Sequence, residues 1–325
     1  MTTREDVARA AGVSMMTVTR VVLNKGYVSP DTRQRVERAI EELGYIPNKL
    51  AANLVGQKSR TIAVILRELT NPYYIHLVDA MISRAQNYGC VVILFKTDEE
   101  HLDGVMKEII SNRVMGVVNM MFTVLPDEAN RQLKEYGIKG IFTGAESDFK
   151  FTIDYESAMR EAMVRLKASG IKKPAFISGL RPELFSTDTR VSIFEKYCAE
   201  LWGIVSPVIL HGNYPAQESF VVGRSLMEEL LRSHPETDAA FCLNDMMAFG
   251  AMKAVIRSGR RVPEDISVIG FDNILMSDYF NPSLSTVGVN IREEAFNYVD
   301  YLVGQPKATD FVITAEYVER KSTKK

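Results

Sequence analysis

The sequence predicts an N-terminal all-α domain followed by an α/β body of two doubly wound parallel-sheet lobes. Residues 4–45 carry helix signals only. From Thr61 onward, short runs rich in β-branched residues alternate with amphipathic helical stretches, which is the pattern of βαβ units. About ten such runs over about 265 residues are more than one open sheet usually holds, so we expect two lobes.

The N-terminal domain is predicted to contain three helices. The segment REDVARAAG has a helical pattern that ends at Gly12, and Ser14 is a favourable N-cap for a second helix over 15–23. Ser29 and Pro30 suit the N-cap and the first position of a third helix. Apolar residues recur at helical spacing along this third helix and are expected in the core: Val36, Ala39, Ile40 and Leu43.

The linker and the strands of the body follow in order. Residues 46–60, IPNKLAANLVGQKSR, read as a linker with one short helix, which is too short to be stable without a partner. The runs expected as strands are TIAVIL, CVVILF, GVVNMMF, GIFTG, AFISG, VSPVILHG, AAFCLN and ISVIGFD. Ligands of doubly wound folds bind at the carboxyl ends of the strands, so we expect a binding cleft between the lobes.

The composition is that of a soluble globular protein, with 46% hydrophobic and 25% charged residues. No apolar run reaches the roughly 18 residues of a membrane helix, and the N-terminus MTTREDVARAAG has no secretory signal. Cys90, Cys198 and Cys242 are scattered without metal-binding spacing. We therefore expect a cytoplasmic protein with reduced thiols, no membrane partner, no metal site and no cofactor.

Positive charge gathers at the N-terminus. Residues 1–60 hold ten Lys or Arg and six Asp or Glu, so they carry +4 while the rest of the chain carries −6. A basic domain on an acidic body indicates that this domain alone meets a polyanion. Taken alone, the same charge also fits a solvated helical face.

The second helix is predicted to have one buried and one open face. On a helical wheel, three valines cluster on one side, and the opposite side carries Met16, Thr19 and Arg20, with Met15 on the flank. Two helices joined by a tight turn form a helix-turn-helix, whose second helix enters the major groove of DNA. Without further signals, a small helical cap remains the alternative.

Several motifs together resemble one protein family. The segments TREDVARAAGVSMMTVTRVV, VSPDTRQRVERAIEELGYIPN and LAANLVGQKSRTIAVIL resemble the DNA-binding head and hinge of the LacI/GalR family of bacterial repressors. The likeness continues through NPYY, TIDYESA, CLNDMMAFGAM, RVPEDISVIGFDN and NPSLSTV, so it covers essentially the whole chain in order. The motifs SM-TV-RVV and TIDYE resemble the catabolite-control branch of that family.

The resemblance implies three domains. Residues 1–46 form the helix-turn-helix head, and residues 47–59 form a hinge helix and linker. Residues 60–325 form an effector-binding and dimerisation body that resembles periplasmic sugar-binding proteins. Its N-lobe is expected at about 60–157 and 288–314, and its C-lobe at about 158–287 and 315–325.

The resemblance also implies which residues contact DNA. The positions facing the major groove are Ser14, Met15, Met16, Thr17 and Arg20. The positions that touch phosphates are Thr3, Asn24, Ser29 and Thr32. The hinge helix from Asn48 enters the minor groove, where Leu54 acts as an apolar wedge and Ala51 and Ala52 permit close approach. The alternative for the hinge is that two such helices pack on each other.

Arginine and methionine read bases differently. Arg20 is suited to guanine, the commonest specific base contact. Met15 and Met16 cannot make bidentate hydrogen bonds, so we expect them to contact thymine methyl groups and to adapt to the shape of the groove.

Carried over from the family, the effector-binding positions are Tyr73, Tyr74, Arg190, Tyr214, Asn244, Asp245 and Asp272. The resemblance implies that Arg190 and Asp272 hold polar groups of the ligand and that Tyr214 stacks on it. A guanidinium, a carboxylate, an amide and aromatic faces suit a carbohydrate. Structural roles remain open: Asp272 also suits a helix cap or a bridge between the lobes, and Tyr73 also suits the core. One residue of the Asn-Asp pair suits orienting its loop.

Two departures bear on the ligand. The GIFTGAES segment has Gly144 where several sugar-responsive relatives carry an acidic residue, so one ligand hydroxyl lacks its usual acceptor. Asp188 lies two residues before Arg190 and alters the charge that a ligand meets.

The predicted function is a sequence-specific transcriptional regulator, a repressor that acts as a bacterial, nucleoid-associated homodimer on a near-palindromic operator. A small ligand between the lobes, a sugar or sugar derivative, controls its operator affinity, as inducer or corepressor. The alternative is control by a protein or a non-sugar corepressor. An enzyme is disfavoured because GxGxxG, P-loop, GxSxG and HExxH motifs are missing. A transport-type sugar-binding protein would need a signal peptide and no head.

Overall fold

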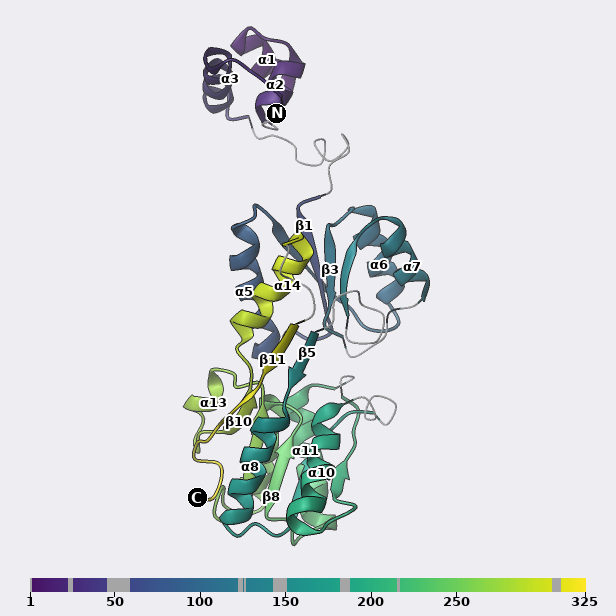
Figure 1. The fold of residues 1–325 in the computed structure, drawn as a ribbon, viewed down its shortest axis with the longest axis vertical. Helices are drawn as coiled ribbons and strands as arrows, with labels where there is room; N and C mark the ends of the chain where they lie inside the picture. The colour runs from purple at the N-terminus through teal and green to yellow at the C-terminus, as the bar shows by residue number, and fades with distance from the viewer. Residues whose placement is uncertain are drawn as a thin grey trace. The chain divides into compact units, whose positions relative to one another are not determined.

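The computed structural model of the protein describes residues 2–22, 26–45, 59–121, 125, 127–142, 151–181, 188–214, 217–305 and 311–325. Contacts divide the chain into two compact units, Met1–Ser59 and Arg60–Lys325, which we describe separately (Figure 1). Five predicted DNA contacts lie outside the described residues, namely Asn24, Asn48, Ala51, Ala52 and Leu54.

The head contains the three predicted helices. They are α1 (Arg4–Ala11), α2 (Met15–Val22) and α3 (Pro30–Glu42). The left-handed backbone of Gly12, with φ of 64°, ends α1 and allows the tight turn into α2. One detail of the prediction is wrong: Leu43 is 38% exposed, and Tyr45, at 8% exposure, takes its place in the core. Leu43 follows the last residue of α3, so the helical period no longer sets its direction.

The N-lobe of the body is a parallel sheet in the order β2-β1-β3-β4. Its strands are β1 (Thr61–Leu66), β2 (Val91–Lys96), β3 (Gly116–Asn119) and β4 (Lys139–Phe142). Its helices are α5 (Pro72–Gln86), α6 (Leu102–Ser111), α7 (Asp127–Glu135) and α14 (Ile291–Val303). Alternate residues of β1 point into two separate cores, so α5 and α14 cover one face and α6 and α7 the other (Figure 1).

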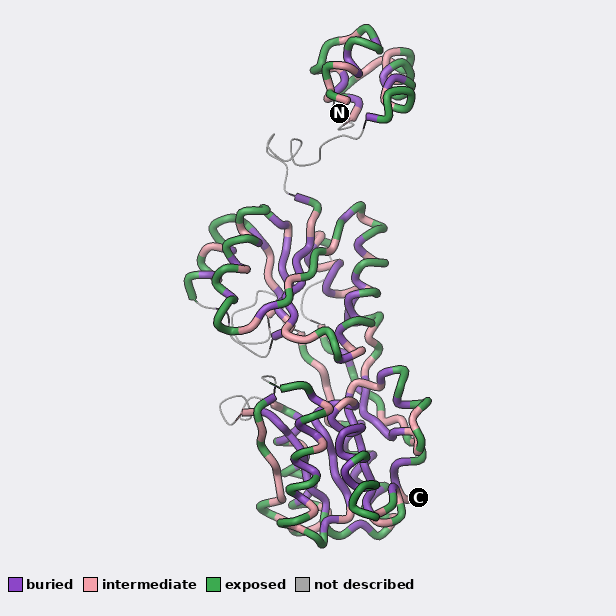
Figure 2. The backbone as a smooth tube through the Cα atoms, turned by 180° about the vertical axis from the view of Figure 1, so that it is seen from behind, coloured by how far each residue is buried: buried purple, intermediate pink, exposed green. Residues whose placement is uncertain are grey.

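The C-lobe is a six-stranded sheet in the order β12-β10-β9-β8-β6-β7, parallel except for β12. Its strands are β6 (Pro174–Ile177), β7 (Val208–Leu210), β8 (Ala239–Cys242), β9 (Ser267–Phe271), β10 (Ser285–Gly288) and β12 (Glu316–Val318). Its helices are α8 (Glu156–Ala168), α10 (Thr189–Trp202), α11 (Ser219–Ser233), α12 (Asp245–Arg257) and α13 (Met276–Tyr279). The central strands are buried on both faces, as Figure 2 shows. Within the described ranges, every helix is too short or too polar to cross a membrane.

Two short parallel strands join the lobes, β5 (Phe151–Asp154) and β11 (Phe311–Thr314) (Figure 1). The chain passes between the lobes after β5, after β10 and after β11. The sequence runs chosen as strands did not include β5, β10, β11 or β12. These strands have only three or four residues, and pairing between segments far apart in the chain defines them.

Two glycines bring α11 and α12 into backbone contact. A Cβ atom added at Gly223 would collide with the carbonyl oxygen of Met247, and one added at Gly250 would collide with that of Phe220. The close crossing fixes the position of α12 relative to α11. Because α12 begins at Asp245, it also fixes the place of the first turn of α12 beside the cleft.

We predict that Gly250→Ala lowers the free energy of unfolding of the body by about 1–3 kcal/mol, because the added methyl group meets backbone that cannot rotate away. The matched control is Gly104→Ala in α6, where nothing lies within 4 Å of the added atom. There the better helix propensity of alanine should raise stability by about 0.5 kcal/mol. Thermal unfolding of the full chain measures both, and equal effects would contradict the close crossing.

Candidate functional site

The α2 helix of the head exposes its methionines. The hydroxyl oxygen of Ser14 accepts a hydrogen bond from the Thr17 backbone N–H at 3.2 Å and caps the helix. Val18 is buried completely, whereas Met15 is 54% and Met16 63% exposed. The predicted open face is therefore present, and it offers two flexible apolar side chains.

The same helix presents one exposed cation. Arg20 is exposed, and its side chain passes close to Gly26, whose missing Cβ would lie 3.8 Å from the Arg20 Cδ. Thr19, predicted on the open face, is only half-exposed. Its hydroxyl donates to the Met15 carbonyl oxygen at 2.8 Å and accepts from the Arg4 guanidinium at 3.3 Å.

The described positions predicted to touch phosphates lie at helix N-termini. Thr3 caps α1 through a reciprocal capping box with Asp6. Ser29 caps α3 by accepting from the Thr32 backbone N–H. The backbone N–H groups of a helix N-terminus favour anions, and carboxylates of the first turn, Asp6 in α1 and Asp31 in α3, already lie at these two places. The phosphate contacts of Thr3, Ser29 and Thr32 therefore remain a prediction.

In the body, the loop 67–71 after β1 bridges the two lobes. The Glu68 carboxylate accepts hydrogen bonds from the hydroxyls of Tyr214, at 3.2 Å, and Ser219, at 3.4 Å, both on the C-lobe. The Asn71 side chain caps α5 through the Tyr73 backbone N–H and also hydrogen-bonds to Asp272 of the C-lobe. Hydrogen bonds therefore join the two lobes at two places in the cleft.

Arg190 is paired within its own helix turn. Its Nε and Nη2 atoms donate to the two carboxylate oxygens of Asp188 at 2.9 and 2.7 Å, and its Nη1 donates to the Leu243 carbonyl oxygen at 2.8 Å. The guanidinium lies 5.7 Å from the ring centre of Tyr155 and 5.4 Å from that of Phe271. Desolvation opposes ionisation of Asp188, but Arg190 outweighs it and holds the pKa of Asp188 below its ordinary value. Asp188, which was predicted to alter the charge that a ligand meets, therefore does so by forming a bidentate ion pair with Arg190.

Asp272 lies at the carboxyl end of β9, as predicted for a cleft residue. Its backbone has φ of 104°, a strained region for a side chain other than glycine. The pKa of Asp272 is raised well above its ordinary value, because of desolvation first and the nearby Asp245 carboxylate second; Arg190 and Asn71 oppose the rise.

Asp245 differs from its predicted role as an effector contact. Its side chain has no exposed surface, and its carboxylate accepts from the Thr286 hydroxyl at 2.6 Å, the Ile274 backbone N–H at 2.9 Å and the Ser277 hydroxyl at 2.6 Å. Desolvation raises the pKa of Asp245 to about 7, against these three donors. The residue therefore fixes the loop that carries Asp272 and presents no oxygen to the cleft.

Asn244 and Tyr214 also differ from prediction. Asn244, 4% exposed, caps α12 through the Met247 backbone N–H at 2.8 Å and donates to Ser219 at 3.1 Å. Tyr214 is 1% exposed, so it has no open ring face for stacking in this arrangement. Both residues reach the cleft through their hydrogen bonds to the Glu68 and Ser219 network.

Tyr73 brings a carboxylate that the sequence analysis did not identify. Its hydroxyl donates to Glu294 of α14 at 2.7 Å, and the Tyr298 hydroxyl donates to the other Glu294 oxygen at 2.8 Å. Burial raises the pKa of Glu294 to about 7. The adjacent Tyr74 is buried, and its ring packs edge-on against Tyr73 with centroids 5.4 Å apart.

Four cleft residues were missed. Glu68 and Asn71 follow a strand of the parallel sheet, so the rule for strand ends could have found them. Tyr155 follows a joining strand within a motif already quoted. Glu294 has no local signal.

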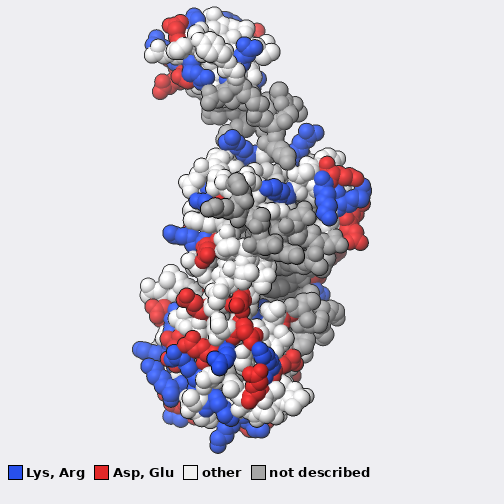
Figure 3. Space-filling model, in the orientation of Figure 1, with Lys and Arg blue, Asp and Glu red and all other residues white. Residues whose placement is uncertain are grey.

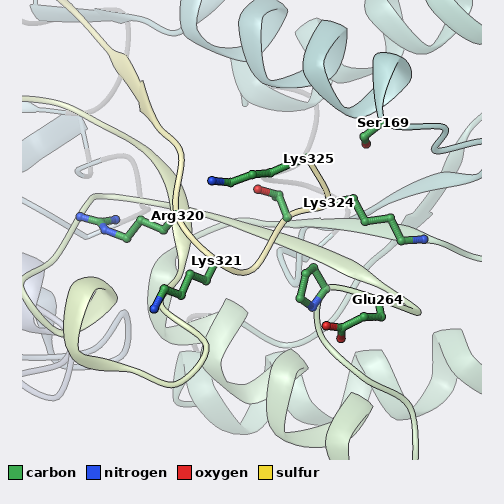
Figure 4. A pocket seen from close by; sticks show the side chains of 8 residues that line it. Ser169, Glu264, Arg320, Lys321, Lys324 and Lys325 are labelled. Carbon is green, nitrogen blue, oxygen red and sulfur yellow. The ribbon is translucent and has the colours of Figure 1, made fainter.

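Hollows adjoin the described part of the body in several places. One of about 440 Å³ lies beside the loop 67–71 and is also lined by residues after β2 and by Gln217 and Glu218 of the C-lobe. Another, of about 630 Å³, is lined by residues of α5, by the start of α14 and by Asn273. A third, of about 490 Å³, has four basic residues in its C-lobe lining. Figure 4 shows that Lys324 points away from Lys321 and Lys325, and Arg320 donates to Asn273 and Leu284. These cations do not converge on one point, whereas the first hollow includes Glu68 of the cleft.

The comparisons with known proteins agree with this geometry. The profile of the bacterial regulatory proteins of the lacI family matches residues 3–48, and that of the periplasmic binding protein-like domain matches residues 164–323. The chain is 32% identical over 292 residues to catabolite control protein A of Priestia megaterium, which covers 87% of this chain and 86% of that protein. The chain belongs to the LacI family.

Solved structures share the fold of this LacI-family regulator. A Lac repressor dimer bound to operator and the anti-inducer ONPF has a TM-score of 0.83 at 29% identity, covering 99% of both chains. The complex of the transcriptional regulator CelR with cellobiose has a TM-score of 0.70 at 25% identity, covering 99% of this chain and 100% of that one. The predicted family and fold class are confirmed, and the chain is a DNA-binding transcriptional regulator.

The exposed methionines of the LacI-family regulator predict a methyl-dependent operator. We expect thymine-to-uracil replacement at the steps under α2 to weaken binding about fourfold per methyl, from about 0.8 kcal/mol per buried carbon. The operator is first selected from random duplexes with the full chain, and fluorescence anisotropy then measures affinity. Met16→Ala should reduce the difference in affinity between the thymine and uracil duplexes. A duplex with uracil outside the half-sites is the control. Equal affinity for both duplexes would exclude methyl contacts.

Glu294 predicts a pH-dependent stability. A carboxyl group whose folded pKa rises from 4.5 to about 7 stabilises the fold at low pH and loses that contribution as pH rises through 7. Between pH 5 and 8 the free energy of unfolding of the wild type should fall by an amount on the order of 2 kcal/mol because of Glu294. Glu294→Gln should lack this decline. The control is Glu293→Gln, an exposed neighbour on α14. Parallel stability curves for wild type and Glu294→Gln would contradict the shift.

Proposed function

We propose that this regulator represses transcription from a near-palindromic operator and that a small polar ligand, a sugar or sugar derivative, controls its affinity from the cleft between the lobes. The observation that carries the proposal is the hydrogen-bonded cleft, where Arg190, Asp272 and aromatic rings meet polar groups of both lobes. We infer that the cleft serves binding and not catalysis, since the relatives are transcriptional regulators. We place the protein on chromosomal DNA in the bacterial cytoplasm.

The head supports the DNA side of the proposal. Arg20 and the two methionines are exposed on one helix, and the basic excess of the chain lies in residues 1–60. On the face drawn in Figure 3, basic and acidic side chains are interspersed over the C-lobe. That face of the body thus lacks the uniform positive field that would attract a phosphate backbone.

The cleft supports the effector side. The solved CelR structure is a complex with the sugar cellobiose, and the Lac repressor structure is bound to the anti-inducer ONPF. The cleft of this chain brings together carboxylates, a guanidinium and aromatic faces, which are the groups that usually bind a carbohydrate. A ligand that displaces the Tyr214 and Ser219 hydroxyls from Glu68 would change the spacing of the lobes. Whether it releases or strengthens DNA binding depends on which arrangement it favours.

Exposed apolar side chains support a homodimer. The edge strand β2 exposes Val91, Ile93 and Leu94, between 40% and 52%. An edge strand with five apolar residues in a row, Val91 to Phe95, is prone to pairing unless another surface covers it. In the C-lobe, Leu275 and Tyr279 are 63% and 79% exposed. We propose that both lobes contribute to one two-fold interface.

We predict that Arg20→Ala weakens operator binding about tenfold to a hundredfold and relaxes base specificity, because it removes the exposed cation of α2. The control is Arg9→Ala, since Arg9 is exposed and pairs with Glu5 and Asp6 on its own helix. Anisotropy titrations against specific and scrambled duplexes at several salt concentrations measure operator affinity and base specificity separately. Equal losses for both variants, or unchanged operator affinity across a panel of sugars, would contradict the proposal.

A further inference from the structure

We propose that the effector carries a positively charged amine: the cleft selects a small polyhydroxylated cation, such as an amino sugar, over neutral or anionic sugars. The inference rests on the proposed function, because it takes the cleft to be the effector site. It adds the charge of the ligand, which the fold alone does not specify.

Three carboxyl groups lie at or beside the cleft, and none of them forms an ion pair with a described residue. Glu68 is bonded to the hydroxyls of Tyr214, Ser219 and Thr70. Glu294, 1% exposed, is bonded to two tyrosine hydroxyls. Asp272 is bonded to the Asn71 amide. All these donors are neutral.

Most of the described cations nearby are already paired. Asp188 takes two N–H groups of Arg190, whose charge also acts on Asp272. In the lining of the hollow beside Glu68, Arg67 lies 3.4 Å from Glu99 and His101 pairs with Asp98 at 2.7 Å, while Lys96 also lines this hollow. Glu68, Asp272 and Glu294 themselves have no ion-pair partner among the described residues.

Burial makes these carboxyl groups selective for the charge of a ligand. A carboxylate taken out of water needs either a proton or a cation close by. The pKa values of Glu68, Asp272 and Glu294 are all raised, chiefly by desolvation, so a cation placed beside these groups would favour their ionised forms. A neutral sugar supplies hydroxyl donors but no charge, and a phosphate or carboxylate on the ligand would be repelled.

The groups around the acids suit an ammonium ion. Asp272 and Glu294 are joined through neighbouring residues at the start of α5, since Asn71 bonds one and Tyr73 the other. Tyr155, after β5, lies edge-on to Phe271 with centroids 5.7 Å apart. This pair of rings already accommodates the Arg190 guanidinium, so the cleft has the aromatic faces on which cations rest. The remaining charged groups toward Asp272 are Asp245 of α12 and Arg190 of α10.

Matched ligand sets test the inference with the full-length protein. Each set contains a hexose, its 2-amino-2-deoxy form, the N-acetylated amine and the 6-phosphate, in the gluco, galacto and manno series, with cellobiose and lactose added as neutral sugars. Thermal shift ranks the ligands and calorimetry measures the dissociation constants. In at least one series we expect the free amine to bind about tenfold to a hundredfold tighter than its neutral and anionic counterparts, the strength of a charge-assisted hydrogen bond.

Variants connect the preference to the carboxylates. Glu68→Gln and Glu294→Gln should each lower the amine-to-hexose affinity ratio about tenfold, whereas Glu293→Gln on the same helix should leave it unchanged. Unfolding curves identify any variant that fails to fold, and the two sites are independent tests.

The outcomes separate the two proposals. Binding led by a neutral or phosphorylated sugar, or amine binding that neither glutamine variant weakens, overturns the cationic ligand and leaves the effector cleft standing. If no compound in any set binds or changes operator affinity, the carbohydrate effector falls as well.

Discussion

The buried carboxylate of Asp245 is the interaction on which the cleft depends. It has no exposed surface, yet it ties the start of α12 to the turn at Ile274–Ser277 and to Thr286 on β10. These three hydrogen bonds hold the loop after β9 while its first residue, Asp272, adopts a strained backbone. A buried charge is tolerated only when its hydrogen bonds are satisfied, so the polar site at the cleft is built on a structural acid behind it.

Hydrogen bonds from one loop of the N-lobe hold the two lobes together at the cleft. Each lobe is a separate sheet with its own core, and only thin joining strands connect the two. The loop 67–71 supplies the additional hydrogen bonds, from Glu68 and Asn71 to the C-lobe. A ligand has to replace these bonds, so recognition and lobe movement involve the same atoms. Such coupling is what a ligand-controlled regulator requires.

In the head, helical periodicity connects burial with DNA recognition. The short α2 helix must bury Val18 and Val21, and its remaining surface is then turned outward. That surface places Met15 and Met16 in solvent, where their apolar side chains gain nothing until another molecule covers them. A groove lined by thymine methyls would cover them, whereas Arg20 on the same face suits a polar contact.

The sequence by itself determined the head and the alternating α/β pattern, because caps, helical period and strand composition are local signals. The cleft positions Tyr73, Arg190 and Asp272 were implied by the resemblance to the LacI/GalR family. It also indicated through Asp188 that the charge of the cleft is altered. Only the tertiary structure decided that Glu294 belongs to the site, since its partner Tyr73 is 221 positions away. The short strands β5 and β11 and the structural role of Asp245 were hidden for the same reason. Contacts between residues far apart in the chain leave no periodic pattern in the sequence. These contacts, and the desolvation that they cause, decide which carboxyl groups have no cationic partner.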